Sequence, residues 1–556
     1  MSEESKAHQP QKAHVNSEAE AHQKMVRGSA WMTAGSVFSR VLGAIYIIPW
    51  VLWLGSNSTQ GNALYAKGYN IYSFFLLVAI GGIPSAISKQ ISEYNAQNEY
   101  AVGQRLFKRG LLLTSAFGIF FGLIMWFGAG LIAAAFGGGD PNVIPVLRAL
   151  AIALVIIPSM SLTRGFFQGY QQMAPSAISQ FVEQVFRVLY MLGATYFIMR
   201  VQRGDWVDAI TQSTFAAFIG AAASFLLLGW YYYRKRPELN ELAAQSEHKL
   251  AIPIWQLFRD IIVQAIPFIV IDTATTVFNL LDQATFQPMM QMIYHMDVPK
   301  INALYAYFAF NANKLVMIIV SLASAIAVTV VPILSESLAS HNMRNIRKQL
   351  EDSIILFLFI MIPGALGMAA IAQPLNTLFY SYNQIGTLIL QISAFTAIVL
   401  GLFTVVSALM QGLSRNRDII RYYLIGLIVK LIVQWPCIYF LSTAGPLVAT
   451  AIGMMVACVM AMYDLEVNFG IRYVKLLPKV NRILVYSIMT YLAARVTVYG
   501  LNFLLNEQSK TQAFLIVVLA VAVGGGVYAY FALKSRLVDL MIGGRAAGLR
   551  RKLKIK

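Results

Sequence analysis

A run of 62 consecutive residues without a charged side chain, from Ser353 to Ser414, constrains this 556-residue chain more than any other feature. At about 1.5 Å per residue, a single helix of that length would be about three times as long as the ~30 Å hydrocarbon core of a membrane is thick. The run must therefore cross a membrane, turn and cross it again. We predict the turn at Gln373–Gln384, which is rich in Asn, Gln and Pro.

Apolar windows separated by charge clusters and by Gly, Pro and Asn predict fourteen membrane-spanning helices. Only 12% of the residues are charged and 58% are hydrophobic, which excludes a water-soluble enzyme and a disordered protein. We expect an all-α polytopic membrane protein. Its predicted spans are 28–54, 68–88, 109–136, 143–165, 176–199, 209–233, 260–284, 304–334, 353–374, 386–411, 419–440, 446–465, 482–504 and 512–533.

Basic residues predict the orientation of these spans, because short cytoplasmic loops are enriched in Lys and Arg. With the N-terminus inside, 32 of the 43 Lys and Arg residues fall on the inner side, and only five, including Lys67, fall outside. Both termini are therefore predicted to be cytoplasmic. The formal net charge of +18 then comes mostly from basic residues that orient the spans in the membrane. It therefore favours anionic membrane lipids over nucleic acid as partners.

Three pairs of short motifs indicate an internal repeat with an offset of 240 to 248 residues. The stretch Asn62–Ala66 has the same sequence as Asn302–Ala306, and a Gln-Gly pair and a Pro recur in the same order further along. We predict two six-helix lobes in parallel orientation, as in transporters whose substrate site lies between the lobes. The predicted parts are a disordered tail (1–24), an N-lobe (25–233), a cytoplasmic linker (234–259), a C-lobe (260–466), two additional helices (467–536) and a basic cytoplasmic tail (537–556).

Polar residues follow one face of three predicted spans, where hydrocarbon should reject them. Small hydroxyl residues alone can simply hydrogen-bond neighbouring helices, so a cavity is favoured mainly for the charged members. The candidate cavity residues are Ser36 and Arg40 in the first span, Asp272, Asn279 and Asp282 in the seventh, and Lys314 in the eighth.

Other intramembrane charges have plainer explanations. Glu183 and Arg187 are four residues apart and can pair on one helix face. Lys430 could snorkel to an interface. Lys89, near the predicted cytoplasmic face, is either a solvated helix end or a point where an anionic headgroup could enter the protein.

The chain contains no motif that indicates an enzyme or a metal site. It has no His-Glu-x-x-His or Walker sequence, and its two cysteines lie in apolar stretches. We therefore expect neither a catalytic site, a cofactor nor a metal. Without a nucleotide site, transport would have to run on the membrane potential, on a Na⁺ or H⁺ gradient, or on the gradient of the substrate itself.

The segment Gly35–Gly43, which contains Ser-Arg-Val-Leu-Gly, and the later segment Gly82–Lys89 resemble the polysaccharide-exporter branch of the multidrug/oligosaccharidyl-lipid/polysaccharide superfamily, in particular the Gram-positive MurJ-like lipid II flippases. The resemblance implies two lobes around a cationic cavity that an undecaprenyl-pyrophosphate-linked headgroup crosses. It places Arg40 at the family's essential first-helix arginine. Tyr46 stands where many members have a second arginine, so the cavity has fewer cations than is usual in the family.

We expect a monomeric plasma-membrane flippase for a lipid-linked cell-wall precursor, with lipid II as the first choice. Export of a capsule or teichoic-acid precursor is the next alternative. It is followed by cation-coupled drug antiport and then by a scaffold that recruits cell-wall synthesis proteins. The resemblance implies that Arg40 and Lys314 neutralise the pyrophosphate, while Asp272 and Asp282 balance the cavity or take part in cation coupling.

Overall fold

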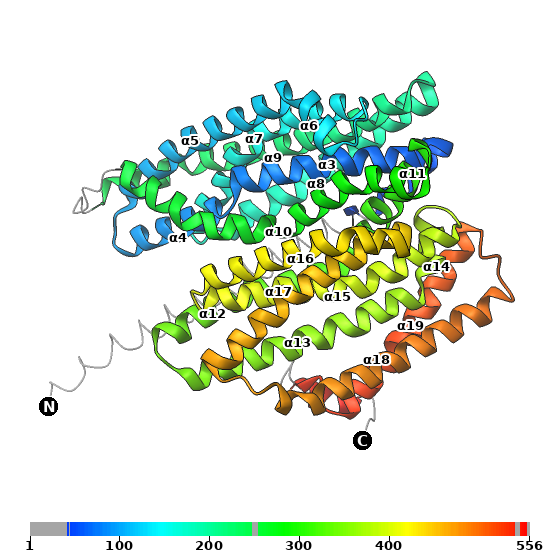
Figure 1. Ribbon diagram of the computed structural model, residues 1–556. Coiled ribbons are helices and arrows are strands. Elements are labelled where there is room, and N and C mark those ends of the chain that lie inside the picture. Colours follow the sequence, from blue (N-terminus) through cyan, green and yellow to red (C-terminus); the bar gives the residue numbers. More distant parts are fainter. Residues whose placement is uncertain (1–41, 44, 247–253, 540–544, 553–556) are drawn as a thin grey trace. The chain divides into compact units, whose positions relative to one another are not determined.

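The computed structural model describes residues 42–43, 45–246, 254–539 and 545–552. These residues are almost entirely helical, and no strand occurs among them (Figure 1). They divide into two compact units. Unit 1 holds the described residues of Met1–Tyr46, Ile71–Ala133 and Pro141–Ile269, and unit 2 holds those of Ile47–Asn70, Ala134–Asp140 and Val270–Lys556.

The first half of the sequence forms helices α2 to α9. Most of them lie in unit 1, but α2, the first part of α3 and the end of α6 belong to unit 2. Their bounds are α2 Ile47–Leu54, α3 Ser58–Ile80, α4 Ile83–Ala96, α5 Tyr100–Phe127, α6 Ala129–Phe136, α7 Val143–Gly169, α8 Met173–Tyr196 and α9 Trp206–Ala244, with short turns at η1 Gly55–Asn57 and η2 Phe197–Gln202.

Helix α10 begins in unit 1 and ends in unit 2, and the later helices all belong to unit 2. The bounds are α10 Ile254–Tyr294, α11 Val298–Ala306, η3 Tyr307–Ala312, α12 Asn313–Ala339, α13 Met343–Ala370, α14 Ala372–Phe379, α15 Gln384–Gly412, α16 Asn416–Leu441, η4 Ser442–Ala444, α17 Gly445–Phe469, α18 Tyr473–Asn502, α19 Lys510–Lys534 and α21 Arg545–Lys552.

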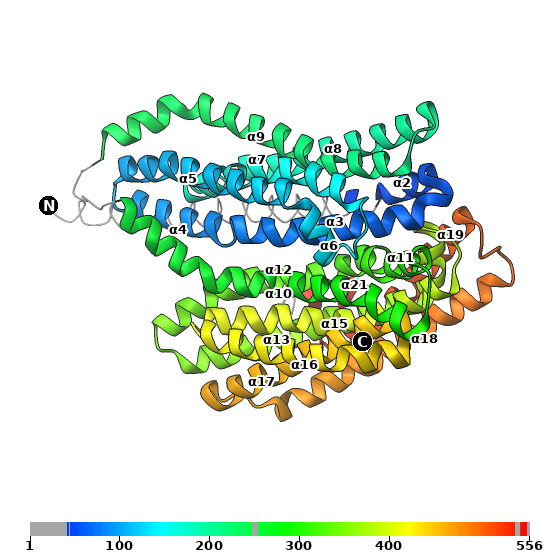
Figure 2. The ribbon, with the colours of Figure 1, turned by 45° about the horizontal axis from the view of Figure 1, so that its top comes forward.

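Unit 1 is a bundle in which α5, α7 and α9 run side by side, with α8 against α9 (Figure 2). Aromatic rings fill the space between these helices: the ring of Phe166 on α7 lies 4.2 Å from that of Phe107 on α5 and 5.9 Å from that of Tyr232 on α9, measured between centroids. Gly118 on α5 allows a close approach to α7, because a Cβ there would lie 2.7 Å from the carbonyl oxygen of Leu154. Helix packing in this unit thus combines large rings at one place with a small residue that allows close approach at another.

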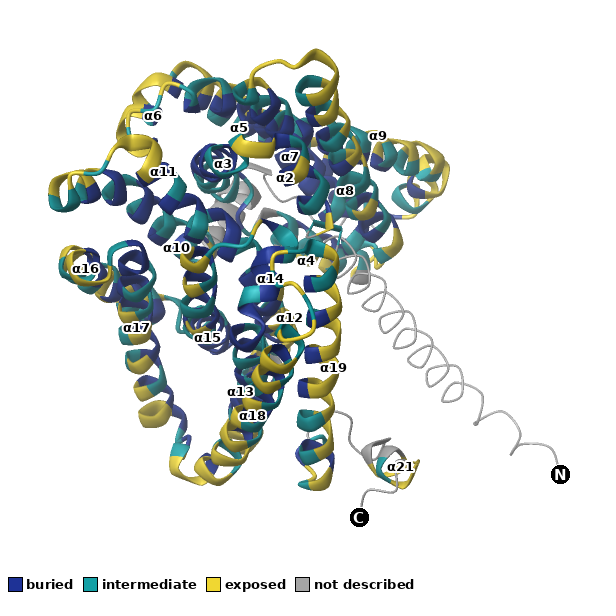
Figure 3. Ribbon diagram, turned by 90° about the vertical axis from the view of Figure 1, so that its right-hand side faces the viewer, coloured by how far each residue is buried: buried dark blue, intermediate teal, exposed yellow. Residues whose placement is uncertain are grey.

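Unit 2 packs α12 against α15, α15 against α13 and α17, and α16 against α17. Helices α18 and α19 pack on each other and on α13, where a smaller apolar core includes Phe359, Ile483 and Ala532. The outward faces of α18 and α19 carry exposed apolar side chains (Figure 3). Apolar side chains that face outward along a long helix are typical of lipid contact.

The described residues contain 11 candidate membrane spans that are long and apolar enough to cross a bilayer. One of them, Asn416–Phe469, is 54 residues long and contains both α16 and α17, which the sequence predicts as two spans. The chain is therefore a multi-pass membrane protein of the all-α class. The exact count of fourteen spans and the orientation of the termini stay predictions.

Two helix breaks fall in the predicted turns, at residues 380–383 and 442–444, but the structure also interrupts the predicted second span, 68–88, at Gly81–Gly82 and the predicted third, 109–136, at Gly128. Within the long uncharged run, α13 ends at Ala370, the short α14 follows, and α15 begins at Gln384. At the start of α15, the Asn383 side chain accepts a hydrogen bond from the Gly386 amide at 2.8 Å. The next break is η4, Ser442–Ala444. The predicted eighth span is a continuous helical segment with a π-helical turn, η3, inside it. Such turns often lie at functional sites.

Candidate functional site

Unit 2 contains a cavity of about 540 Å³ between α10, α12 and α15. Its carboxylate is Asp272, and its other polar side chains are hydroxyls and amides. They are Thr275, Thr276, Asn279, Ser324, Thr404, Ser407 and Gln411. No Lys, Arg or His belongs to the lining among the residues that the structure describes. This size lies in the range of about 300–1,000 Å³ that is typical of ligand sites.

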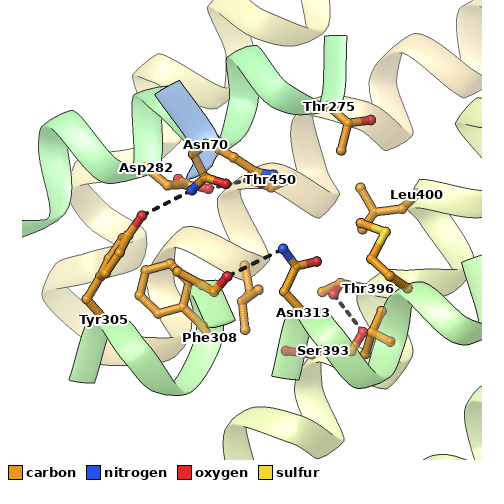
Figure 4. Close-up of a pocket in the computed structure, with 15 residues that line it drawn as sticks. Asn70, Thr275, Asp282, Tyr305, Phe308, Asn313, Ser393, Thr396, Leu400 and Thr450 are labelled. Atoms are coloured by element: carbon orange, nitrogen blue, oxygen red, sulfur yellow. Dashed lines mark hydrogen bonds between the residues drawn. The ribbon is translucent and has the colours of Figure 1, made fainter. Parts of the chain in front are cut away.

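A second, narrower cavity of about 50 Å³ adjoins the first along the same helices. Figure 4 shows the side chains that line this narrow cavity. The two share Thr275, Asn279, Met317 and Leu400 in their linings. The narrow cavity extends to Asp282 on α10, and to residues of α3, α11, α15 and α17 that include Asn70, Tyr305, Ser393 and Thr450. A column of polar side chains therefore runs along α10 through unit 2.

Two serine hydroxyls on α15 are buried without a hydrogen-bond partner in the described part of the chain. Ser407 belongs to the larger cavity and is 2% exposed, while Ser393 belongs to the narrow one and is 3% exposed. A buried polar group without a partner costs about 1–3 kcal/mol. Groups of this kind are expected where a ligand or water completes the hydrogen bonds.

Asp282 forms a fully buried ion pair with Lys430 of α16. The Lys430 Nζ lies 2.8 Å from Asp282 Oδ1, and it also donates to the Phe278 carbonyl oxygen at 2.7 Å and to Thr450 Oγ1 at 2.9 Å. Gln434 Nε2 donates to the same carboxylate oxygen at 2.9 Å. Every hydrogen-bonding position of the ammonium is thus occupied, as burial of a charge requires.

Two glycines bring α16 and α17 close enough to build this pair. A Cβ on Gly426 would lie 2.3 Å from the carbonyl oxygen of Gly453, and a Cβ on Gly453 would lie 2.5 Å from that of Gly426. Small residues at a crossing allow two membrane helices to approach closely. Lys430, one turn after Gly426, is held between α10 and α17 as a result.

Polar side chains also join α3 to α10 and α11 in unit 2. The Nζ of Lys67, which is 3% exposed, donates to Asn302 Oδ1 at 2.8 Å and lies 4.0 Å from Asp140 Oδ2. Gln283 Nε2 donates to the backbone carbonyl oxygen of Lys67 at 3.1 Å, and Asn62 Nδ2 donates to Asn311 Oδ1 at 2.7 Å. We call this set the α3 seam.

The α3 seam brings the two copies of the repeated motif together. Asn62 begins the first copy, Lys67 directly follows it, and Asn302 begins the second. At one end of the α3 seam, Gln287 Nε2 donates a hydrogen bond to the carbonyl oxygen of Gly138 at 2.9 Å. Gly138 has a φ of +69°, and a Cβ there would collide with the Gln287 side chain. Glycine is therefore required at this turn.

Lys314 lies among three aromatic rings. Its Nζ is 5.4 Å from the ring centroids of Tyr65 and Tyr69 and 5.5 Å from that of Phe310. These distances are within the range of cation–π attraction. The rings hold the ammonium at the start of α12, beside Asn313 and close to Met317, both of which line the narrow cavity.

Unit 1 contains a separate cluster of charges. Arg164 of α7 donates to Glu183 Oε2, Ser179 Oγ and Ser224 Oγ, each at 2.8 Å, and Arg187 Nη2 donates to Glu183 Oε1 at 2.5 Å. The predicted pairing of Glu183 with Arg187 is confirmed. Arg164, at the end of the predicted fourth span, joins the same carboxylate.

The structure brings some of the predicted site residues together and leaves others apart. Asp272 and Asn279 line the larger cavity, and Asn279 and Asp282 line the narrow one. Lys89 is highly exposed, and its Nζ lies 3.9 Å from Glu93 Oε1. Ser36 and Arg40 lie outside the described residues.

Sequence reasoning missed two buried lysines. Lys430 was expected to snorkel but is 0% exposed, and Lys67 was expected in an outer loop but lies within α3. Hydropathy cannot show that an acid and a base from distant helices face each other. A usable signal was present for Lys430, since Gln434 lies one turn further along the same face.

Metal binding finds no support in the described residues. No group of three or more His, Cys, Asp or Glu side chains there could hold a metal ion. Both cysteines are free, with Cys458 buried.

Comparison with known proteins gives relatives along nearly the whole chain. The family model described as polysaccharide biosynthesis protein matches residues 25–338. The lipid II flippase MurJ of Bacillus subtilis (strain 168) is 32% identical over 541 residues, covering 95% of this chain and 98% of the relative. Stage V sporulation protein B of the same organism is 27% identical over 168 residues, covering 30% of this chain and 32% of the relative.

Solved structures share the fold. A lipid II flippase MurJ in an inward closed conformation matches with a TM-score of 0.60 and 14% identity, covering 89% of this chain and 98% of that one. An inward-facing multidrug resistance transporter of the MATE family and MOP superfamily matches with a TM-score of 0.63 and 12% identity, covering 78% and 94%. The matched family model and the identity along nearly the full length lead to one conclusion: the chain belongs to the polysaccharide biosynthesis protein family.

Proposed function

We propose that this protein is a transporter that moves lipid II from the inner to the outer leaflet of the plasma membrane by alternating access. The observation that carries the proposal is the 32% identity to a lipid II flippase over 95% of the chain. The polar column along α10 supports it, because a polar headgroup needs such a lining to cross hydrocarbon. The enrichment of Lys and Arg in alternate loops supports cytoplasmic positions for both termini.

Lys314 and Arg40 are the proposed partners of the pyrophosphate. The ammonium of Lys314 lies among aromatic faces, which stabilise a cation, and an ammonium forms charge-assisted hydrogen bonds with an anion such as pyrophosphate. Arg40 is proposed from its place in the Ser-Arg-Val-Leu-Gly motif alone. Lys89, exposed near the predicted cytoplasmic face, is proposed as a first contact for the headgroup.

The membrane potential is a proposed energy source. Moving one elementary charge across 100 mV changes the free energy by about 2.3 kcal/mol, so an inside-negative potential favours outward movement of an anionic headgroup. Coupling to Na⁺ or H⁺ is the alternative. Asp272 is the acid proposed to take part in it, because Asp282 already has the Lys430 ammonium against it.

A depletion experiment tests the proposal. The native lipid II flippase is depleted in a bacterial host that expresses this chain, the Arg40→Ala variant or the Lys314→Met variant, and the externally accessible fraction of lipid II is measured. We expect the unmodified chain to restore outward lipid II and both variants, at equal membrane levels, to restore much less. The proposal is wrong if the unmodified chain is present at normal levels in the membrane and restores none.

Exposed lysine Lys534 provides a matched control for Lys314. Lys534→Met removes one positive charge at the end of α19, and we expect it to restore lipid II as well as the unmodified chain does. Equal failure of the Lys314 and Lys534 variants would show that total charge, rather than the position of Lys314, sets the activity.

A further inference from the structure

One charged side chain lies within the apolar outward face of α18. Leu492, Val496 and Tyr499 are 54%, 70% and 68% exposed on this face, and Arg495 lies among them and is exposed as well (Figure 3). Hydrocarbon rejects a charged side chain, so a residue of this kind usually faces the protein interior or has a charged partner. Arg495 faces outward, which raises the question of what neutralises it.

The neighbouring helices provide no counter-charge for Arg495. Helix α18 packs against α13 and α19, and the sequence of α13 is uncharged from Ser353 onward, while that of α19 is uncharged from Thr511 to Leu533. In the described part of the chain the guanidinium forms no ion pair and one hydrogen bond, from Nη1 to the carbonyl oxygen of Ala370 at 3.5 Å. Most of its five N–H donors are therefore open.

The acid nearest to Arg495 along the chain is already engaged. Glu507 lies in the loop after α18, where it accepts hydrogen bonds from Gln373 Nε2 and, at 3.3 Å, from Asn502 Nδ2. The buried ammonium of Lys430, by contrast, has a carboxylate oxygen 2.8 Å away. The counter-charge of Arg495 therefore has to come from outside the protein.

The position of Arg495 along α18 indicates what this counter-charge is. Lys475, Lys479 and Arg482 mark the end of the helix at the predicted inner interface, and a hydrocarbon core of about 30 Å then needs about 20 residues, which end near Asn502. Arg495 lies seven residues before Asn502, or about 10 Å. From there a long arginine side chain can direct its charged end to the headgroup region, where the phosphates of phospholipids lie.

We propose that Arg495 binds the phosphate of a bilayer phospholipid in the leaflet at the Asn502 end of α18, which is the predicted outer leaflet. A guanidinium matches a phosphate in shape, because two parallel N–H groups can donate to two oxygens. Arg495 belongs to neither cavity lining, so this lipid stays at the outer surface of the protein and is not the one that is transported. The site goes beyond the proposed function and does not depend on it.

Labelling by lipids with and without a phosphate tests the proposal. The full chain in detergent is irradiated with increasing amounts of phosphatidylglycerol that carries a photoreactive headgroup, and the label on Tyr491–Glu507 is quantified by mass spectrometry. We expect Arg495→Gln to raise the half-saturating concentration about tenfold, the equivalent of one charge-assisted hydrogen bond. A diglucosyl diacylglycerol with the same reactive group and no phosphate should label the segment weakly, and equally in both proteins.

Further variants separate binding from folding and from net charge. Arg203→Gln removes the same charge from an exposed turn of unit 1, just after η2, and should leave the labelling of α18 unchanged. Arg495→Lys keeps the charge but not the paired donors, and should raise the half-saturating concentration by roughly 2- to 5-fold. Arg495→Gln should unfold at the same temperature as the unmodified chain in detergent, because the side chain it replaces is exposed and forms one long hydrogen bond.

The outcomes decide the site and the source of the phosphate. Equal labelling of the unmodified chain and Arg495→Gln by phosphatidylglycerol overturns the proposal, and so does equally strong labelling of the unmodified chain by the phosphate-free lipid. If undecaprenyl pyrophosphate displaces the reactive lipid at lower concentrations than phosphatidylglycerol does, Arg495 serves the transported lipid and the proposal is wrong. A phosphate-dependent loss in Arg495→Gln, with more effective competition by phosphatidylglycerol and with Arg203→Gln unaffected, establishes the site.

Discussion

The Asp282–Lys430 pair of unit 2 and the Glu183 cluster of unit 1 differ in charge balance and in exposure. Asp282 and Lys430 in unit 2 pair one to one, with side chains 8% and 0% exposed. In unit 1, Glu183 lies between Arg164 and Arg187, and the three side chains are 13% to 20% exposed. The comparison shows that full burial requires a balanced pair, while partial exposure tolerates two guanidinium groups around one carboxylate.

The largest effect is expected from breaking the balanced pair. Lys430→Met leaves the Asp282 carboxylate buried without its counter-charge, so the free energy of unfolding should fall by about 3–5 kcal/mol. Replacement of both partners, as in Asp282→Leu with Lys430→Met, should recover most of that loss. Thermal unfolding in detergent, with Lys534→Met as the control, measures it. A double variant no more stable than the single one would contradict this account.

A smaller effect is expected in unit 1. Glu183→Gln leaves Arg164 and Arg187 without the carboxylate between them, and we expect a loss of about 1–3 kcal/mol, because both guanidinium groups are partly exposed and water screens them. The same unfolding assay applies, with the exposed Glu241→Gln on α9 as a matched control. If Glu183→Gln lowers the free energy of unfolding as much as Lys430→Met does, solvent exposure does not determine how much each cluster contributes to stability.

The α3 seam should show a coupling of about 1 kcal/mol between Lys67 and Asn302. The value is modest because the ammonium has Gln287, at 3.5 Å, and Asp140 as further partners. A double-mutant cycle with Lys67→Met and Asn302→Ala, followed by thermal unfolding, measures the coupling. Strictly additive effects would show that Lys67 and Asn302 do not stabilise each other.

The smallest effect concerns an ion pair outside the membrane spans. Arg550 of α21 donates to both carboxylate oxygens of Asp539, at 2.5 and 3.0 Å, and these hydrogen bonds hold the pKa of Asp539 below its ordinary value of 3.8. Because the folded pKa is lowered, the contact stabilises α21 above pH 3.8 and is lost as the pH falls through the folded pKa.

A spin label at the exposed Ala547 measures this contact. Its mobility should stay constant from neutral pH to about pH 4 and then rise as Asp539 is protonated. Asp539→Asn should give the high mobility at every pH. A mobility that is the same in both proteins at neutral pH would show that the pair does not hold α21.

Local features of the fold could be predicted from the sequence because they depend on local composition. The break at residues 380–383, between α14 and α15, lies inside the turn predicted in the uncharged run, and the Glu183–Arg187 pair follows from helical spacing. The polar face of α10 also follows from spacing, and its residues do line the two cavities.

The partners of these residues could not be predicted, because they come from distant parts of the chain. Asp282 and Lys430 are 148 positions apart, and nothing in either helix alone shows that they meet. Ser407 looks like an ordinary small residue in an apolar helix, and only the structure shows that its buried hydroxyl has no hydrogen-bond partner in the described part of the chain. A periodic pattern assigns a face to a residue but does not say what the face contacts.

Photo-cross-linking tests the central claim, that the headgroup crosses through the column in unit 2, most directly. Lipid II with a photoreactive group on its glycan is bound to the full chain in nanodiscs and irradiated, and the labelled peptides are mapped by mass spectrometry. The account predicts labels on α10, α12 and α15 that unlabelled lipid II suppresses and Asp272→Ala reduces. Labels confined to the outward faces of α18 and α19 would contradict it.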